Sequence, residues 1–368
     1  MSTSDSALPG PGAARGPAAG EAGEAFAALG ARVRAAVEAR LGALFEARRR
    51  EAGRYGGDVS ALLDAVRELT MRGGKRLRPA LLVASYRACG GGPGEGEDVA
   101  IGLGVALELL QTYLLVHDDW MDGDAVRRGG PSVHVMLGAH FGSQAKGNAA
   151  AILAGDYANA LALEVAAGAL GASARACEAL VYFARVQQDV VFGQQLDIVG
   201  RGEDVELMHG LKTGSYTVRG PLELGAICAG ATASRRQALG AYGGPLGVAF
   251  QLRDDLLGVF GSERETGKPR GGDLRAGKHT SVVAEALGRL GPGERAAFER
   301  AFGRAGAGEG EVEAAIEALE RCGARRAVEG RLETLVAEAC RALRSDALDG
   351  EGARLLEGAA LALTARQS

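Results

Sequence analysis

The chain has 368 residues, 47% of them apolar and 24% charged, with a formal net charge of −4 at pH 7. This length and apolar share suffice for a large buried core, and the weakly negative charge excludes a general attraction to nucleic acid or to an anionic membrane surface. The five cysteines are scattered and show no Cys-x-x-Cys spacing, which excludes a disulfide framework and a cysteine-based zinc site. We therefore expect a globular protein of the reducing cytoplasm without a transmembrane segment.

The N-terminal segment differs in composition from the rest of the chain. Residues 1–22 are rich in Gly, Ala and Pro and lack the basic start and apolar core of a signal peptide, so we expect them to be disordered. From Ala25 onward, apolar residues recur at intervals of three and four, and alternating β-branched runs are scarce. Because only short Gly-rich segments interrupt this pattern, residues 23–368 are predicted to form a single all-α domain.

The first chemically distinctive segment is GGKRLRP, which begins at Gly73 and carries Lys75, Arg76 and Arg78. Arginine binds phosphate through a planar pair of hydrogen bonds, and lysine binds it as a mobile point charge. The two glycines allow a turn that brings these basic side chains together. The segment therefore predicts an anion site suited to a diphosphate.

An apolar stretch, residues 101–116, leads into the acidic sequence DDWMD. Polar residues interrupt the stretch, which is too short to cross a membrane, so we expect a buried helix. On that helix Asp118 and Asp122 lie one turn apart, where two carboxylates repel each other unless a cation lies between them. Carboxylate oxygens suit Mg²⁺, which binds through one or two carboxylates together with substrate phosphates. A phosphate ester is the expected substrate.

Further charged residues downstream complete two matched sets. These residues are Arg127, Arg128, Lys212, Asp254, Asp255, Lys268 and Lys278. One diphosphate would bind through basic residues alone, and a second would bind through metal ions held by the carboxylates. Two differently bound diphosphates imply a reaction with two substrates.

A series of motifs follows one order along the chain: GGKRLRP, ELLQTYLLVHDDWMD with VRRGGPSVH, GDYANAL, FGQQLDI, KTGSYT, FQLRDDLLGVFG and TGKPRGGDLRAGKHT. Over this span the chain resembles the trans-polyprenyl diphosphate synthase family, short-chain type. The resemblance implies an all-α isoprenoid synthase fold, a helical bundle around a central cavity, and a homodimer. It also implies Mg²⁺-dependent head-to-tail condensation of isopentenyl diphosphate with an allylic diphosphate, with three metal ions bound together with the substrate diphosphate.

By this resemblance the site residues divide according to what they bind. The metal set is Asp118, Asp122, Asp254 and Asp255, in which Asp255, like Asp119, supports the ligands or holds metal-bound water. The set for the allylic diphosphate is Arg127, Lys212, Lys268 and Lys278. The set for isopentenyl diphosphate is Lys75, Arg78, Gln111 and Arg128.

The residues expected at the reacting carbon are Lys212, Thr213 and Gln251, with Asp118 and Asp119 beside them. The expected supporting residues are Asp197, Tyr216 and Asp273. No protein general base is assigned, because the resemblance implies that the released diphosphate takes the proton.

The chain departs from the family pattern in its second acidic motif. Gly258 stands where many relatives carry a third Asp, and Ser262 replaces an acidic residue that is common just beyond. These departures predict a weaker metal set, with activity retained because Asp254 and Asp255 remain.

Product length is expected to depend on Tyr113, five residues before Asp118. At a helical rise of about 1.5 Å per residue, Tyr113 lies roughly 7.5 Å from Asp118 along the axis. The resemblance implies that this position, with Leu110 and Leu114, closes the tunnel for the growing chain, although an aromatic on a buried helix face is also typical of an ordinary core. DDWMD lacks a two-residue insertion, which favours a twenty-carbon (geranylgeranyl) product, with a fifteen-carbon (farnesyl) product next.

Two other functions remain open at this point. A class I terpene cyclase shares the all-α fold and the first acidic motif, but it needs no isopentenyl diphosphate site and usually has Ser or Thr at the position of Gly258. A non-catalytic partner subunit of a prenyl synthase would have lost aspartates or lysines that this chain retains.

Overall fold

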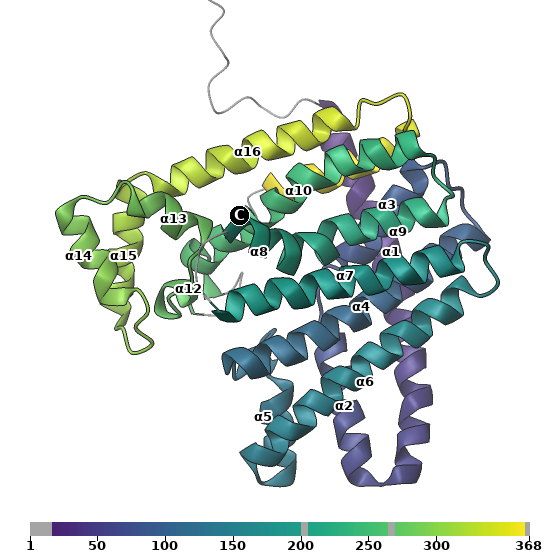
Figure 1. Ribbon diagram of the computed structural model, residues 1–368, viewed down its shortest axis with the longest axis horizontal. Helices are drawn as coiled ribbons and strands as arrows, with labels where there is room; N and C mark the ends of the chain where they lie inside the picture. The colour runs from purple at the N-terminus through teal and green to yellow at the C-terminus, as the bar shows by residue number, and fades with distance from the viewer. Residues whose placement is uncertain (1–16, 200–204, 264–268, 365–368) are drawn as a thin grey trace, which may run out of the picture.

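The computed structural model describes residues 17–199, 205–263 and 269–364, and its regular structure in these ranges is almost entirely helical (Figure 1). The helices of the first half are α1 (Pro17–Ala52), α2 (Gly57–Met71), α3 (Leu77–Ala88), α4 (Glu95–Asp122), α5 (Val133–Phe141), α6 (Gln144–Leu170) and α7 (Ala176–Val199). A short 3₁₀ helix, η1 (Gly53–Tyr55), joins α1 to α2. Strands β1 (Val126–Arg127) and β2 (Gly130–Pro131) form an antiparallel hairpin between α4 and α5.

The second half begins with α8 (Val205–His209) and a π-helix, η2 (Gly210–Arg219). The helices that follow are α9 (Gly220–Cys228), α10 (Ala233–Phe260), α12 (Gly272–Arg275), α13 (Ser281–Leu287), α14 (Pro292–Ala301), α15 (Glu309–Arg321), α16 (Ala324–Ala342) and α17 (Gly350–Thr364). The predicted all-α fold is thereby confirmed.

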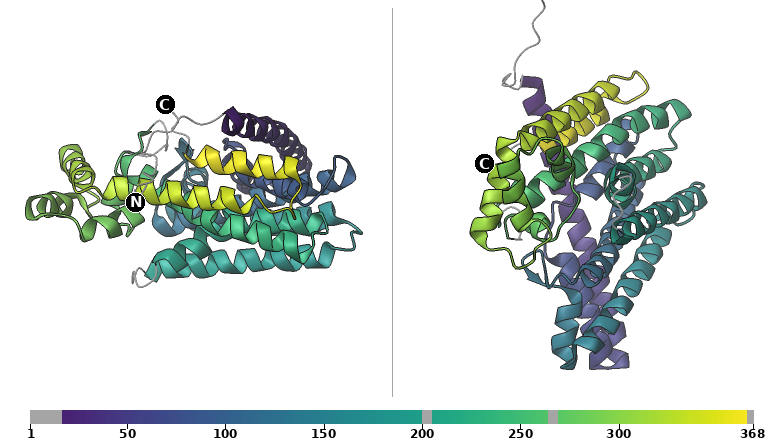
Figure 2. Two further views of the ribbon diagram at one scale, coloured as in Figure 1. Left: turned by 90° about the horizontal axis from the view of Figure 1, so that it is seen from above. Right: turned by 60° about the vertical axis from the view of Figure 1, so that its left-hand side comes forward.

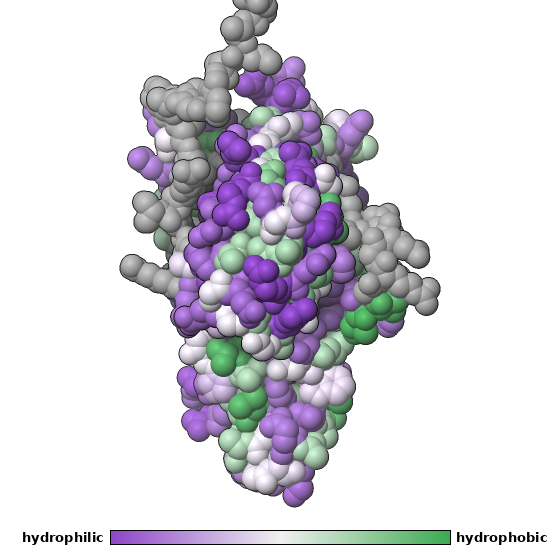
Figure 3. Space-filling model, turned by 90° about the vertical axis from the view of Figure 1, so that its left-hand side faces the viewer, coloured by the Kyte–Doolittle hydropathy of each residue, from purple (hydrophilic) through white to green (hydrophobic). Residues whose placement is uncertain are grey.

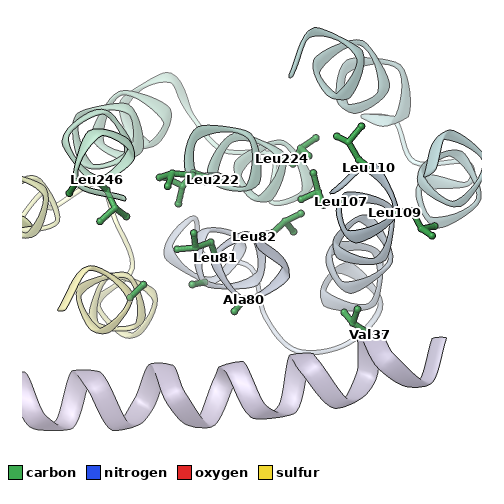
Figure 4. Packing of buried hydrophobic residues seen from close by; sticks show 14 of the residues in the cluster. Val37, Ala80, Leu81, Leu82, Leu107, Leu109, Leu110, Leu222, Leu224 and Leu246 are labelled. Atoms are coloured by element: carbon green, nitrogen blue, oxygen red, sulfur yellow. The ribbon is translucent and has the colours of Figure 1, made fainter. Parts of the chain in front are cut away.

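Helix α3 lies at the centre of the hydrophobic core. Ten of its 12 residues are buried, as expected for a helix that is apolar around most of its circumference. Helices α1, α4, α9 and α17 pack around it, and Figure 4 shows Leu82 of α3, Leu107 of α4 and Leu224 of α9 lying next to one another between these helices. Helix α9 approaches closely because Gly225 has no side chain, since a Cβ there would lie 2.3 Å from the carbonyl oxygen of Leu82.

Helix α4 crosses the core and carries the first acidic motif at its C-terminal end. Every residue from Ile101 to Leu110 is buried, so the expected buried helix is confirmed. By length and composition α4 and α6 both qualify as membrane-spanning candidates, but 72% of the apolar window of α4 is buried inside the protein, against 39% for α6. Helix α4 is therefore a core helix, whereas α6 leaves part of its apolar surface exposed.

Helix α1 begins earlier than the sequence indicated. It starts at Pro17, inside the segment 1–22 that we expected to be disordered. Ala22 is fully buried, and a Cβ at Gly358 of α17 would lie 2.0 Å from the carbonyl oxygen of Ala22. The expected boundary was wrong because the alanines of this segment favour a helix, and packing against α17 offsets the cost of its glycines. Residues 1–16 lie outside the described residues.

Helices α13, α14 and α15 lie together at one end of the bundle, on the left in Figure 1 and in further views in Figure 2. The long helices α10 and α16 pack against each other and connect this end to the main core. Helices α4, α7 and α10 all end on the same side (Figure 1), which brings the segments that carry the acidic motifs and Lys212 together.

Candidate active site

The carboxylates in the last turn of α4 form the centre of the candidate site. Asp118 accepts hydrogen bonds from Arg127 Nη2 at 3.2 Å and from Lys212 Nζ at 3.1 Å. Lys212 also donates to Asp197 Oδ2 of α7 at 2.5 Å. The hairpin, α7 and η2 thereby converge on the end of α4.

The contacts of Arg127 and Lys212 balance the negative charge of Asp118 at the C-terminal end of α4. The C-terminal end of a helix carries partial negative charge, so aspartates there need cations from elsewhere in the fold. Burial opposes ionisation of Asp118, but Lys212 and Arg127 lower its pKa. Burial likewise opposes the charge on Lys212, and the carboxylates of Asp118 and Asp197 raise the pKa of its ammonium group.

The other aspartates of the first motif differ in burial. Asp119 is fully buried and accepts from Arg127 Nε at 2.6 Å, and burial raises the pKa of its carboxyl group. Asp122 is only partly buried, with 29% of its side chain exposed and Lys278 Nζ 3.8 Å from its Oδ2. This partial burial and the nearby Asp118 carboxylate raise the pKa of its carboxyl group. Lys278 therefore approaches the first motif from the segment between α12 and α13.

The second acidic motif contains two carboxylates with separate roles. Asp254 reaches solvent, but the protein around it and the carboxylates of Asp255 and Asp273 raise its pKa to about 7. Asp255 is buried, and its two oxygens accept from Gln251 Nε2 at 2.8 Å and from the backbone N–H of Ser281 at 2.7 Å. Asp255 thus fixes the start of α13, which suits a supporting role rather than direct metal ligation.

The position of Gly258 is occupied by a neighbouring carboxylate. A Cβ at Gly258 would lie 1.8 Å from Asp273 Oδ2 of α12. A third aspartate at position 258 would therefore displace Asp273. In this chain the acidic group beside Asp254 comes from α12, and Ser262 is exposed.

The donor set fits a divalent metal that arrives with its substrate. Among the described residues, no three His, Cys, Asp or Glu side chains converge into a group that would hold a metal by themselves. Asp119 Oδ2 is buried without a hydrogen-bond partner, so the first motif retains an unsatisfied acceptor. Mg²⁺ typically binds through one or two carboxylates and completes its shell with water and phosphate oxygens.

The basic residues expected to bind isopentenyl diphosphate lie around the start of α3. Arg78 is buried, donates to Thr217 Oγ1 at 2.8 Å, and lies 4.3 Å from the centre of the Tyr216 ring, a cation–π contact. Arg128 Nη1 donates to the Gly73 carbonyl at 3.1 Å, and Lys75 is exposed. Gln111 is half-buried on α4.

Arg128 adopts a backbone conformation that is unusual for a side-chain-bearing residue. Its φ is 53° and that of Gly129 is 72°, as in a type I′ hairpin turn. Such strain in a non-glycine residue persists only where surrounding contacts enforce it, and it is typical of functional sites.

Arg76 has a different role from the one that the sequence indicated. We grouped it with the phosphate-binding residues, but it is only 3% exposed, and it donates to Glu108 Oε2 at 2.6 Å and to the Thr70 carbonyl at 2.8 Å. This interpretation was wrong because Glu108, within the apolar stretch of α4, needs a buried counter-charge. The interruption of that stretch by Glu108 was the sequence signal for such a partner.

The expected tunnel floor is partly in the core. Leu110 is fully buried in the hydrophobic core (Figure 4), while Tyr113 and Leu114 are half-buried. The Tyr113 ring meets His117 edge-to-face, with ring centroids 4.9 Å apart. His117 Nε2 lies 3.1 Å from the Ile152 carbonyl oxygen of α6, so the aromatic pair is fixed between α4 and α6.

The π-helix η2 presents Lys212, with Thr213 half-buried beside it. Short π segments occur frequently at functional sites. The backbone of η2 approaches α7 at Gly193, where a Cβ would lie 2.2 Å from the backbone nitrogen of Lys212.

Two further residues near the site remain to be placed. Lys268 lies outside the described residues. Asp124, whose Oδ2 lies 3.4 Å from Arg127 Nη2, was not foreseen, although only Gly123 separates it from DDWMD.

Residues 59–319 match the model of the polyprenyl synthetase family. The chain belongs to this family. It is 37% identical to the short-chain isoprenyl diphosphate synthase of Methanothermobacter thermautotrophicus over 271 residues, which cover 72% of this chain and 78% of that protein. The chain is therefore a prenyltransferase.

Solved structures share the fold. The geranylgeranyl pyrophosphate synthase of Corynebacterium glutamicum, complexed with isoprenyl diphosphate and magnesium, superposes with a TM-score of 0.84 at 30% identity, covering 91% of this chain and 99% of that one. The polyprenyl synthase of Caulobacter crescentus, complexed with calcium and isoprenyl diphosphate, superposes with a TM-score of 0.74 at 28% identity. The match covers 93% of this chain and 98% of that one.

The different environments of Lys75 and Arg76 generate a matched prediction. Arg76→Met leaves the Glu108 carboxylate buried without its partner, so the free energy of unfolding should fall by about 3–5 kcal/mol, measured by urea denaturation. Lys75→Met should change this free energy by less than about 0.5 kcal/mol, because its side chain is exposed. It should nevertheless weaken isopentenyl diphosphate binding. An Arg76→Met variant of normal stability that no longer binds this substrate would make Arg76 a ligand instead.

Proposed function

We propose that this chain catalyses Mg²⁺-dependent head-to-tail condensation of isopentenyl diphosphate with an allylic diphosphate, giving geranylgeranyl diphosphate and free diphosphate. The observation that carries the proposal is the meeting of two unlike anion sites at the end of α4. One pairs Asp118 with Arg127 and Lys212. The other is a group of basic side chains around the start of α3, namely Lys75, Arg78 and Arg128.

The allylic diphosphate binds at the first of these sites. Its ligands are metal ions on Asp118, Asp122 and Asp254, proposed to number three in all, together with the cations of Arg127, Lys212 and Lys278. The metal, when bound, supplies positive charge for the departing diphosphate. Arg127 and Lys212 are already held by aspartates and so are oriented toward that leaving group before the reaction begins.

Isopentenyl diphosphate binds at Lys75, Arg78 and Arg128 without metal. The C–O bond of the allylic diphosphate breaks, and the terminal carbon of isopentenyl diphosphate forms the new C–C bond with the resulting allylic cation. Loss of a proton to the released diphosphate then restores a double bond. The ring of Tyr216, which lies against Arg78, and the hydroxyl of Thr213 border the path of the positive charge.

Tyr113 is the proposed determinant of product length. Its ring is supported on one side by His117, which in turn contacts α6, so it resists displacement by a growing chain. A rigid aromatic at this depth supports a twenty-carbon product, as does the name of the similar Corynebacterium protein. A fifteen-carbon product would keep the reaction and place the tunnel floor nearer to Asp118.

A homodimer in the cytoplasm is the proposed assembly. Helix α6 has three exposed large apolar residues, Ile152, Leu153 and Leu163, and Leu153 is 60% exposed. Ala160 of the same helix is also exposed. Strongly hydrophobic residues are visible along the edge of the molecule in Figure 3. An apolar surface on a long rigid helix suits a self-complementary two-fold interface.

The reaction is tested by incubating the protein with labelled isopentenyl diphosphate and each of dimethylallyl, geranyl and farnesyl diphosphate, with and without Mg²⁺, followed by chromatography of the dephosphorylated products. A Mg²⁺-dependent twenty-carbon alcohol is expected. Asp118→Ala should lower turnover by at least about 10³-fold without loss of helical content, whereas Asp58→Ala, a change at a side chain that is 81% exposed, should not. In a further incubation with geranylgeranyl diphosphate, or in that with farnesyl diphosphate, hydrocarbons formed without incorporation of isopentenyl diphosphate would instead identify a cyclase.

Tyr113→Ala should lengthen the products beyond twenty carbons, because removing the ring opens space below the site. The same chromatography of chain lengths measures this effect. Tyr55→Ala, at a tyrosine that is 71% exposed on η1, serves as the control and should leave the distribution unchanged. An unaltered distribution in Tyr113→Ala would place the floor elsewhere.

Leu153→Arg should convert the dimer to a monomer, because it places a charge in the proposed apolar interface. Light scattering coupled to gel filtration measures the mass. Leu287→Arg introduces the same change at a leucine of α13 that is 41% exposed, and it should leave the dimer intact. A wild-type protein that is monomeric at micromolar concentration would contradict the proposed assembly.

A further inference from the structure

We propose that Arg72 is a positioning residue that fixes the β1–β2 hairpin against α2, and that Gly130 is required to admit its guanidinium group. The hairpin carries one arginine for each diphosphate, so Arg72 sets the relative position of the two substrates. This inference rests on the proposed function.

The Arg72 side chain joins three elements. Its Nη1 donates to the Pro131 carbonyl at 2.6 Å and to the Arg127 carbonyl at 3.2 Å, one from each strand of the hairpin. Its Nη2 pairs with Glu68 of α2 and lies 3.2 Å from Met136 Sδ of α5. Only 12% of the side chain is exposed. Because Glu68 balances its charge and hairpin carbonyls accept from it, Arg72 serves the fold of the site rather than the substrate.

Gly130 leaves the space that this guanidinium fills. A Cβ at position 130 would lie 2.5 Å from the Arg72 Cζ atom, 2.7 Å from Nη1 and 2.8 Å from Nε. Gly130 has no positive φ, so its backbone conformation does not itself require glycine. The three atoms nearest to such a Cβ all belong to Arg72, so this side chain fills the space that Gly130 leaves.

The hairpin needs such external support. It contains only two residue pairs, and short isolated hairpins are marginal in water. Its turn residue, Arg128, is held in a left-handed conformation that is unfavourable for arginine. The planar guanidinium group of Arg72 donates to both strands at once and so resists slippage of one strand along the other. The ammonium group of a lysine lacks this fixed planar geometry and would resist slippage less.

The two arginines of the hairpin depend on this support to different extents. Arg127 is also held by Asp118, Asp119 and Asp124, and so retains its position through ion pairs. Arg128 is held through its hydrogen bond to Gly73, the residue next to Arg72 in the chain. Loss of the Arg72 contacts should therefore displace Arg128 more than Arg127. It should weaken the binding of isopentenyl diphosphate more than the binding of the allylic diphosphate.

The test compares Arg72→Met, Arg72→Lys and Gly130→Ala with Arg67→Met, a matched change at an arginine on α2 whose side chain is 45% exposed. KM is measured separately for isopentenyl and geranyl diphosphate, and metal-free binding of isopentenyl diphosphate is measured by calorimetry. Arg72→Met and Gly130→Ala should raise KM and Kd for isopentenyl diphosphate about tenfold, with the KM for geranyl diphosphate within about threefold of wild type. Arg72→Lys should not restore binding, and Arg67→Met should match wild type.

Equal increases in the two KM values, or a loss of stability with both KM values unchanged, would overturn the proposal. Full rescue by Arg72→Lys would also overturn it, because charge alone would then suffice. If Arg72→Met fails to fold, Gly130→Ala applies the same displacement with the arginine retained. A wild-type protein that does not incorporate isopentenyl diphosphate would instead refute the proposed function, independently of these variants.

Discussion

The site depends on the compensation of three aspartates placed in the last turn of α4. A helix C-terminus already carries partial negative charge, so these carboxylates require cations that α4 does not itself supply. Arg127 from the hairpin and Lys212 from η2 meet Asp118, and Lys278 approaches Asp122. Ion pairs with these aspartates thus hold the hairpin, the π-helix and the segment after α12 at the C-terminal end of α4. The apolar core around α3 provides the rigid support on which these elements are held.

The sequence predicted the parts of the site that depend on local periodicity. Spacing placed Asp118 and Asp122 on one helix face, and the apolar run before them predicted the burial of α4, which the structure confirms. Contacts between distant residues were beyond this reasoning, such as that of Asp118 with Lys212, 94 residues away. Arg76 was misassigned for the same reason, because its partner Glu108 lies on another helix. The family resemblance supplied the remaining expectations, since composition and periodicity do not show where a side chain points.

Close approach at glycines shapes the site as much as charge does. Gly193 lets η2 bring Lys212 against α7, Gly258 makes room for the Asp273 carboxylate, and Gly130 admits the Arg72 guanidinium. In each case a methyl group would lie within 2.6 Å of the neighbouring group. The departure at Gly258 is then a rearrangement rather than a simple loss, because a carboxylate from α12 stands beside the second acidic motif. Which carboxylates lie beside Asp254 therefore depends on the packing of α10 against α12 as well as on the residue at position 258.

The two proposed substrate sites differ in how far they are formed before binding. Arg78 is buried against Tyr216 and bonded to Thr217, and Arg128 is held in a strained turn, so these two cations of the proposed isopentenyl diphosphate site are fixed in place, whereas Lys75 is exposed. The cations for the allylic diphosphate are instead paired with Asp118 and Asp197. A diphosphate that enters there must share Lys212 and Arg127 with these carboxylates, which leaves the carboxylates under-compensated unless positive charge arrives with the ligand. A diphosphate accompanied by divalent cations meets this requirement, and an unaccompanied one does not. The charge balance around Asp118 therefore supports the proposed separation into one metal-dependent and one metal-independent diphosphate site.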